Sequence, residues 1–231
     1  MTDAEISNAE KYRYERKFVV SDRTQLESII RMHPAMFAES YPPRFVNNIY
    51  LDSFHLKNYL DATDGLSDRK KVRIRWYGHL FGNVRRPILE IKIKQGLIGR
   101  KELFPIEGFS MKKGFKPCIV VKILKRATIP DSLRLDLMSL EFVLLNRYRR
   151  EYFVSADQNY RMTIDSEMQY YYLGSGRNYF MQQSIDFANT VLELKYSKRQ
   201  EGSVEKITNR FPFRVSRNSK YVNGIERLGL W

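Results

Sequence analysis

The sequence has few of the residues on which several classes of protein site depend. It has one cysteine, Cys118, among 231 residues, so no disulfide can form within the chain. This cysteine usage fits a reducing, cytoplasmic setting. Cys118 lies in an apolar context and is expected to be buried as a small hydrophobic residue. The three histidines, His33, His55 and His79, lack metal-ligand spacing and are expected at surface helix ends or turns.

Other absences exclude further classes. The chain has no Gly-rich phosphate loop followed by a lysine and no motif that supports Ser-His-Asp chemistry. It has no run of roughly 18 apolar residues that could span a membrane, and its first residues lack the pattern of a signal peptide. We therefore expect no membrane segment in this chain, and the sequence leaves room for a separate membrane partner.

Positive charge is what the sequence has in excess. Its 40 lysines and arginines outnumber 26 acidic residues, for a formal net charge of +14. Such an excess favours anionic partners: nucleic acid, a phosphorylated small molecule, polyphosphate or an anionic membrane. Hydrophobic residues make up 43% of the chain, and 15 tyrosines and 14 phenylalanines favour strands.

Alternation predicts the strands and gives several of them a charged face. In Thr190–Ser197, Glu193 and Lys195 share one face, and Leu192, Leu194 and Tyr196 share the other. The same pattern recurs elsewhere, with these charged sets: Arg13, Glu15 and Lys17; Lys71, Arg73 and Arg75; Glu90, Lys92 and Lys94.

The remaining pattern predicts one α+β domain over 12–231, after a lead-in over 1–11. A helical insertion is expected over about 110–146. Further strands are expected at 12–20, 45–52, 70–77, 87–94, 98–106, 148–156, 162–165 and 168–173. Helices are expected at about 21–31, 53–61, 111–126, 131–145, 202–210 and 219–228.

The charged faces have two interpretations. A charged strand face is most often the solvated side of a half-buried sheet. Here several strands each place two or three charges, mostly positive, on one face, and like charges opposite one another destabilise a sheet. A bound polyanion would relieve that repulsion, so we expect these faces to surround a lumen that holds one.

The charged segments also resemble a known family. Its motifs occur here in order: Tyr14-Glu-Arg-Lys17, Arg73-Ile-Arg-Trp-Tyr-Gly78, Leu89-Glu-Ile-Lys92, Lys101-Glu102, Tyr148-Arg-Arg150, Arg161-Met-Thr-Ile-Asp165, Leu192-Glu-Leu-Lys195 and Ser219-Lys-Tyr221. This series is similar to the VTC domain, the catalytic domain of polyphosphate polymerases. That domain belongs to the triphosphate tunnel metalloenzymes, with the CYTH proteins.

The resemblance implies an eight-stranded antiparallel β-barrel with helices packed outside, and a metal-dependent polyphosphate polymerase. The implied partners are a nucleoside triphosphate and polyphosphate, not nucleic acid, and the implied cofactor is Mn²⁺ or Mg²⁺. The implied catalytic residues are Lys17, Arg73, Arg75 and Glu193. The implied substrate-binding residues are Lys92, Lys101, Arg150, Arg161, Lys195 and Lys220. The implied metal ligands are Glu193 and Glu15, with Glu90 as a further candidate.

The sequence alone leaves the roles of several of these charged residues undecided. Asp165 could hold metal or bases, or pair with Arg161 as a structural salt bridge. Alternation does not decide whether Arg149 or Arg150 faces the lumen. Arg13 stands where the fuller tunnel-enzyme signature has a glutamate, which removes one potential metal ligand. The alternative functions are a tripolyphosphatase or nucleoside triphosphatase, a polyphosphate-binding module without turnover, and a nucleic-acid binder.

Overall fold

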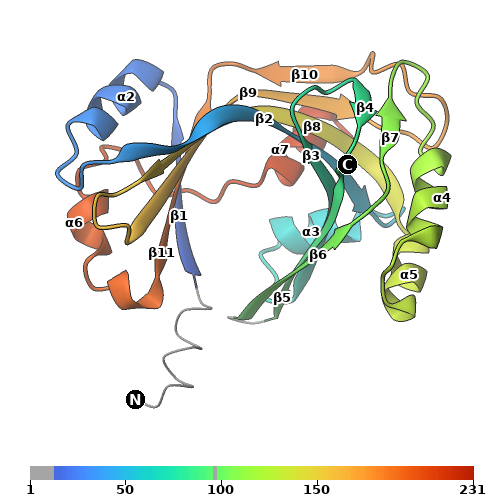
Figure 1. Ribbon diagram of the computed structural model, residues 1–231, viewed down its shortest axis with the longest axis horizontal. Helices are drawn as coiled ribbons and strands as arrows, with labels where there is room; N and C mark the ends of the chain where they lie inside the picture. Colours follow the sequence, from blue (N-terminus) through green and yellow to red (C-terminus); the bar gives the residue numbers. More distant parts are fainter. Residues whose placement is uncertain (1–12, 96–97) are drawn as a thin grey trace. The chain divides into compact units, whose positions relative to one another are not determined.

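The structure is a computed structural model that describes residues 13–95 and 98–231. The predicted lead-in over 1–11 lies outside the described residues, as do residues 96 and 97 between the strands predicted at 87–94 and 98–106. The strands are β1 (Arg13–Val20), β2 (Ala38–Asp52), β3 (Arg69–Tyr77), β4 (Gly82–Val84), β5 (Ile88–Gln95), β6 (Ile98–Pro105), β7 (Phe109–Met111), β8 (Glu141–Val154), β9 (Tyr160–Tyr172), β10 (Gln183–Asp186) and β11 (Thr190–Ser197). The α-helices, labelled with the strands in Figure 1, are α2 (Arg23–Arg31), α3 (Lys57–Thr63), α4 (Cys118–Arg126), α5 (Asp131–Met138), α6 (Val204–Thr208) and α7 (Lys220–Leu228).

The strands form the antiparallel arrangement that the sequence predicts. Hydrogen bonds link eight strands in the order β1-β11-β9-β8-β2-β3-β5-β6, with β10 beside β9, and β4 pairs separately with β7. The pairings β1–β11, β11–β9, β2–β3, β3–β5 and β5–β6 are antiparallel. The α+β class and the eight-stranded antiparallel sheet are therefore confirmed.

Two compact units share these strands. Unit 1 comprises the described residues up to Arg44 with Arg149–Met168 and Asp186–Asn218. Unit 2 comprises Phe45–Tyr148, Gln169–Ile185 and Ser219–Trp231. Each unit has its own apolar core.

In unit 1, helices cover the apolar face of the sheet. Leu26 of α2 and Ile207 of α6 belong to one buried cluster with Leu192 and Leu194 of β11. The helix α2 begins where the sequence predicts, since the Asp22 side chain accepts a hydrogen bond from the backbone N–H of Gln25. Because side chains alternate along a strand, Glu193 and Lys195 lie on the other face.

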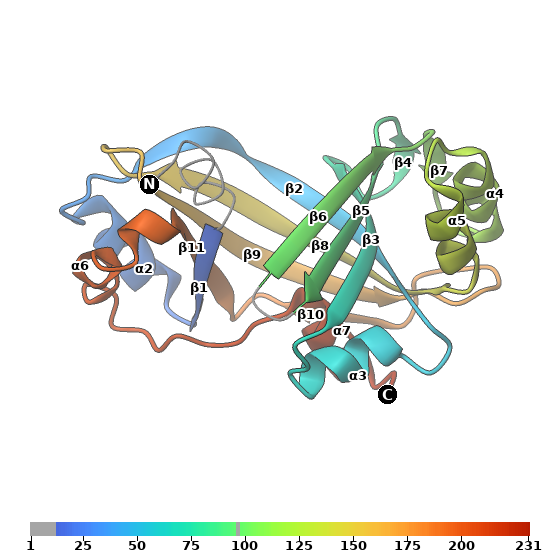
Figure 2. The ribbon, with the colours of Figure 1, turned by 90° about the horizontal axis from the view of Figure 1, so that it is seen from below.

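In unit 2, the strands β3, β5 and β6 lie side by side (Figure 2). Val72 and Ile74 of β3 are buried with residues of α4 and α5, such as Leu124 and Leu137. The bases of β3 therefore occupy the face opposite these two helices. The helix α7 packs on a different strand, β2. Tyr221, near the start of α7, stacks on Tyr50 of β2, with ring centroids 5.0 Å apart.

The structure corrects several predicted elements. Residues 141–145 begin strand β8 instead of ending a helix, so the second helix of the insertion stops at Met138. β2 begins at Ala38 and runs through both prolines at 42 and 43, well before the predicted start of this strand at residue 45. The two strands predicted at 162–165 and 168–173 are one strand, β9. The helix expected at 53–61 begins only at Lys57.

Two individual residues also differ from expectation. Cys118 is exposed, because it lies in the first turn of α4 and the buried face of that helix carries Val120, Ile123 and Leu124. His33 is buried, with its Nε2 3.1 Å from the carbonyl oxygen of Ile207, so it packs inside unit 1 and not at its surface. Burial lowers the pKa of His33.

Candidate functional site

In unit 1, the charged faces of three strands line up in rows. Lys17 of β1 lies opposite Glu193 of β11, which lies opposite Thr163 of β9. Directly opposed residues of antiparallel strands point to the same face. The next row along the strands consists of Glu15, Lys195 and Arg161.

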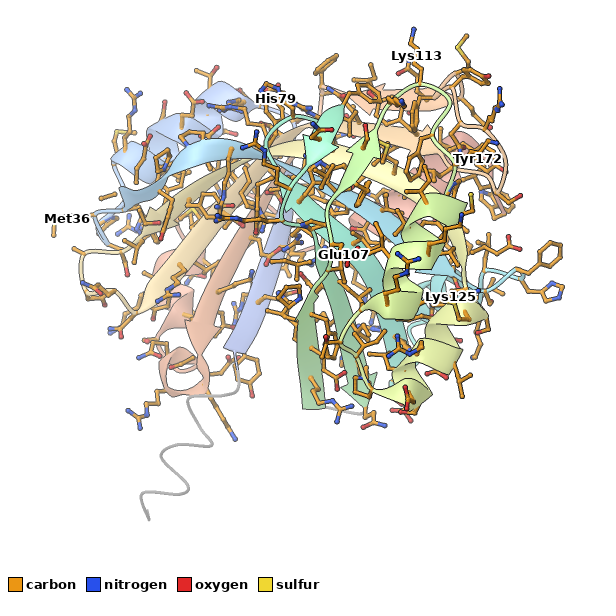
Figure 3. The ribbon with its side chains drawn as sticks, turned by 45° about the vertical axis from the view of Figure 1, so that its right-hand side comes forward. Met36, His79, Glu107, Lys113, Lys125 and Tyr172 are labelled. Atoms are coloured by element: carbon orange, nitrogen blue, oxygen red, sulfur yellow. The ribbon has the colours of Figure 1, made fainter. Side chains whose placement is uncertain are left out.

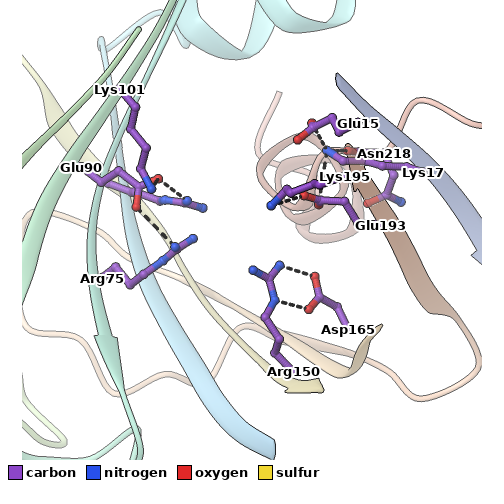
Figure 4. Close-up of polar contacts among 11 residues, drawn as sticks. Glu15, Lys17, Arg75, Glu90, Lys101, Arg150, Asp165, Glu193, Lys195 and Asn218 are labelled. Atoms are coloured by element: carbon purple, nitrogen blue, oxygen red, sulfur yellow. Dashed lines mark hydrogen bonds and ion pairs between the residues drawn. The ribbon is translucent and has the colours of Figure 1, made fainter. Parts of the chain in front are cut away.

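Glu193 is the buried centre of this arrangement, with 7% of the residue exposed. One carboxylate oxygen lies 2.6 Å from Nζ of Lys195, and the other lies 3.9 Å from Nζ of Lys17 (Figure 4). Burial alone would raise the pKa of Glu193, but the charges of Lys195, Lys17 and Arg150 outweigh it and lower that pKa. Glu193 is therefore an anion held among cations.

Lys17 is fixed from several sides. Its Nζ lies 3.0 Å from the carboxylate of Glu15 and donates a 3.3 Å hydrogen bond to the backbone carbonyl of Asn218. Its own carbonyl accepts from the N–H of Ser216, at 2.8 Å. Burial lowers the pKa of Lys17, but the carboxylates of Glu193 and Glu15 more than compensate, so the pKa is raised. The ammonium stays charged and points at the Glu193 carboxylate.

Arg150 is committed to Asp165. Its Nε and Nη2 donate to the two carboxylate oxygens at 2.6 and 2.7 Å, a bidentate pair in which Asp165 is fully buried. The hypothesis that Asp165 pairs with Arg161 is wrong, because Arg161 lies four residues away along β9. The neighbouring Arg149 instead pairs with Glu151.

In unit 2, one buried carboxylate gathers three bases. Glu90 of β5 lies opposite Arg73 of β3 and forms an ion pair with it. Its oxygens also lie 3.3 Å from Nη1 of Arg75 and 3.2 Å from Nζ of Lys101 (Figure 4). Burial would raise the pKa of Glu90, but Arg73, Arg75 and Lys101 lower it to about 2.

Asn48 is a site residue that sequence reasoning missed. Its Oδ1 accepts a 3.0 Å hydrogen bond from Nε of Arg75, and its Nδ2 donates at 2.8 Å to Oδ1 of Asn146. Both asparagines are fully buried. Glu90 and Asn48 thus hold the guanidinium of Arg75 from two sides. An amide in the middle of an apolar strand is the signal that could have identified Asn48.

Lysines extend the basic face of unit 2. Lys92 of β5 lies opposite Lys71 of β3 on one side and Lys101 of β6 on the other. Nζ of Lys71 donates a 2.8 Å hydrogen bond to Oγ of Ser219, at the start of α7. The next residue, Lys220, places its Nζ 4.7 Å from the centre of the Tyr148 ring.

The predicted site residues therefore fall into two sets. In unit 1, the structure brings together Glu15, Lys17, Arg150, Arg161, Glu193 and Lys195 on one face. In unit 2, it brings Arg73, Arg75 and Lys101 together around Glu90, with Lys92 and Lys220 nearby. Arg161 and Lys92 are exposed, as are Glu15 and Lys101 in the same rows.

Metal ligation would have to rely on few protein groups. Within the described ranges, no three His, Cys, Asp or Glu side chains form a ready cluster for a metal ion. Mg²⁺ in phosphoryl-transfer enzymes is commonly held by one or two carboxylates, with substrate phosphates and water completing its coordination. Glu193 fits this mode, and the buried Oγ1 of Thr163 opposite it has no hydrogen-bond partner. Glu15 and Asp165 are further carboxylates on this face, and both oxygens of Asp165 accept from Arg150.

Comparison with known structures defines the class of fold. An adenylate cyclase candidate from Vibrio parahaemolyticus is 12% identical, covers 92% of this chain and 97% of its own, and has a TM-score of 0.50. HpAC1 from Hippeastrum, an adenylyl cyclase candidate with a dominant triphosphatase activity, is 12% identical, with coverages of 94% and 96% and a TM-score of 0.54. PH1819 from Pyrococcus horikoshii OT3 is 14% identical, with coverages of 93% and 99% and a TM-score of 0.51. The chain thus shares the fold of these three proteins.

The sequence comparison gives the family within this class. The model of the VTC domain matches residues 12–229, so the chain belongs to the VTC domain family. No curated protein sequence matches the chain. Among the described residues, no helix is long and apolar enough to cross a lipid bilayer.

Proposed function

We propose that this protein is a metal-dependent polyphosphate polymerase, which transfers the terminal phosphoryl group of a nucleoside triphosphate to a growing polyphosphate chain. The observation that carries the proposal is the buried Glu193 carboxylate held by Lys195 and Lys17 on a charged strand face. Membership in the VTC domain family supports the same assignment.

The bases would bind and orient the phosphates. Arg73 and Arg75 supply guanidinium forks, and Lys17, Lys101 and the other lysines supply point charges. In the transfer, an oxygen of the terminal phosphate of the chain forms a new P–O bond to the γ-phosphorus as the bond to the β-phosphate oxygen breaks. The nucleoside diphosphate then leaves. The cations offset negative charge along this path, so no covalent enzyme intermediate is required.

Glu193 would hold the divalent ion, Mn²⁺ or Mg²⁺, with Glu15 as the second candidate ligand. A divalent ion held there would supply Lewis-acid chemistry and would offset negative charge on the transferred group. Glu193 is suited to this role because its low pKa keeps it ionised throughout the physiological range. Lys195 and Lys17, which pair with this carboxylate, would then be available for the phosphates.

The second candidate function is hydrolysis of the same triphosphate, with water as the acceptor. It is favoured by the structural likeness to HpAC1, whose dominant activity is that of a triphosphatase. Polymerase and hydrolase need the same phosphate-binding bases and the same metal ligand. They differ only in which nucleophile reaches the γ-phosphorus.

The test follows both products in one reaction. Purified protein is incubated with ATP and Mn²⁺, and free phosphate and long-chain polyphosphate are measured together. Glu193→Gln removes the charge at constant shape, and Glu205→Gln, an exposed glutamate of α6, is the matched control. Polyphosphate made by wild type and by the control, but not by Glu193→Gln, is the expected result. Free phosphate alone would establish the hydrolase, and tight triphosphate binding without either product would leave a binding module.

A further inference from the structure

Acidic residues are missing from three neighbouring segments of unit 2. The sequence has no aspartate or glutamate over residues 78–89, 108–130 or 169–185. The same segments carry Arg85 and Arg86, six bases between 112 and 126, and Arg177. A run of this length without an acid departs from the mixed charge of the rest of the chain, where 26 acidic residues accompany 40 basic ones.

Backbone pairing brings the three segments together. β4 pairs with β7, which joins the first segment to the second. An isolated bridge between Phe115 and Asn178 joins the second to the third: the N–H of Asn178 donates to the carbonyl of Phe115, and the carbonyl of Asn178 accepts from the N–H of Gly114. The ring of Phe81 also lies 5.3 Å from that of Phe180. We call the exposed residues of these three segments the acid-free surface.

The bases of the acid-free surface are exposed. Lys112, Lys113 and Lys116 lie in the stretch that leads into α4, and Figure 3 shows Lys113 projecting outward there. Further exposed bases lie on the outer side of α4 itself: Lys122, Lys125 and Arg126. None of these six belongs to the two charged clusters described above.

Large apolar side chains are exposed among these bases. Met181 is 83% exposed, Tyr179 is 52% exposed, Phe81 is 46% exposed and Ile119 is 44% exposed. Tyr179 and Met181 stand on the loop that pairs with the residues before α4. Apolar side chains rimmed by charge are typical of a surface that binds a partner.

We propose that the acid-free surface docks the protein onto an anionic lipid bilayer. Lysines and arginines near such a bilayer are attracted by its negative surface potential. The aromatic rings and the methionine would enter the interfacial layer, where amphipathic and apolar side chains are stabilised. A nucleic acid would match the charge and could stack on the rings, but it offers no apolar layer for Met181 and Ile119. The lipid surface accounts for both sets of residues.

The proposal is independent of the catalytic function and is tested by flotation with vesicles. The full chain is mixed with vesicles of phosphatidylcholine alone, or of equal parts phosphatidylcholine and phosphatidylglycerol. We expect flotation only with the anionic vesicles, weakened by added salt. The variant Lys112→Glu/Lys113→Glu/Lys116→Glu should bind them at least tenfold more weakly. The control Lys198→Glu/Arg199→Glu/Lys206→Glu makes the same charge change on unit 1 and should bind like wild type.

A second variant tests the apolar part. Tyr179→Ser/Met181→Ser keeps every charge and should also weaken flotation, severalfold. Thermal unfolding of each variant shows whether it is folded. The proposal is overturned if wild type does not float with anionic vesicles or if the unit 1 control loses as much binding. It is also overturned if the serine variant floats like wild type, or if the surface binds duplex DNA and not vesicles.

Discussion

Arg150 and Asp165 form a closed, bidentate ion pair inside unit 1, with hydrogen bonds of 2.6 and 2.7 Å. Asp165 is fully buried, so its charge depends on this partner. The base that the family resemblance assigns to phosphate therefore also has a structural function.

This pair makes a prediction about stability. Arg150→Met should lower the free energy of unfolding by about 3–5 kcal/mol, because it leaves a buried carboxylate without its charge partner. Arg150→Met/Asp165→Leu should recover most of that loss, since the unpaired charge is gone. Urea titrations of the two variants and wild type would measure both values. Equal stability of the single and double variants would contradict the structural function.

Arg161 should behave in the opposite way. It is exposed beside Lys195, so Arg161→Ala should change the free energy of unfolding by no more than about 0.5 kcal/mol. Loss of a charged hydrogen-bond donor to phosphate should weaken tripolyphosphate binding by about tenfold. Calorimetric titration would show this, with the exposed Arg199→Ala as the control. Unchanged affinity in Arg161→Ala would remove this arginine from the proposed site.

The lowered pKa of Glu90 predicts how the free energy of unfolding responds to acid. Its pKa falls from 4.5 to about 2 on folding, so ionised Glu90 stabilises the native state at pH values above 4.5. That stabilisation, on the order of 3 kcal/mol, is lost as the pH falls through about 2. Glu90→Gln should be less stable than wild type at pH 7 and should lose less stability between pH 5 and pH 2.

The matched control for this measurement is Glu102→Gln. Glu102 and Arg100 both lie on β6, beside β5, and form an ion pair at 2.7 Å. The side chain of Arg100 is 68% exposed. A pair in this setting contributes little, so the control should keep the acid response of wild type. Parallel acid responses for Glu90→Gln and wild type would show that another group carries the effect.

Cys118 offers a direct chemical test of the helical insertion. Because it is exposed in the first turn of α4, a thiol reagent such as DTNB should label the native protein without denaturant. It is the only cysteine, so the absorbance change reports this position alone. If labelling occurred only after unfolding, Cys118 would be buried, as the sequence predicted, and its exposed position in α4 would be contradicted.

Periodicity in the sequence predicted elements well where the two faces of a strand or helix differ. The strand β11 has the predicted bounds, and α2 and α7 begin within two residues of the predicted starts at 21 and 219 and end at the predicted residues. It failed at residues 141–145, where an apolar run fits a helix or a strand equally well. Whether such a run forms a helix or a strand depends on pairing with neighbouring strands. The sequence of one segment does not show that pairing.

The site shows the same limit at the level of single contacts. Charge on a strand face was predictable for Glu193 and Lys195, because alternation alone fixes their face. The partner of Asp165 was not, because it depends on which residues of β8 and β9 lie side by side. Asn48 was missed for a related reason, since its partner Arg75 lies on a different strand.

The carboxylates of the charged faces also determine which anions can bind. In unit 2, Glu90 already forms ion pairs with Arg73, Arg75 and Lys101. In unit 1, Glu193 forms one with Lys195. Any incoming anion must compete with these tethered groups, which are present at high effective concentration. A single orthophosphate would replace one such ion pair with another and would gain little binding free energy. A chain of linked phosphates gains from several replacements at once, so built-in competition selects for the number of phosphates in the ligand.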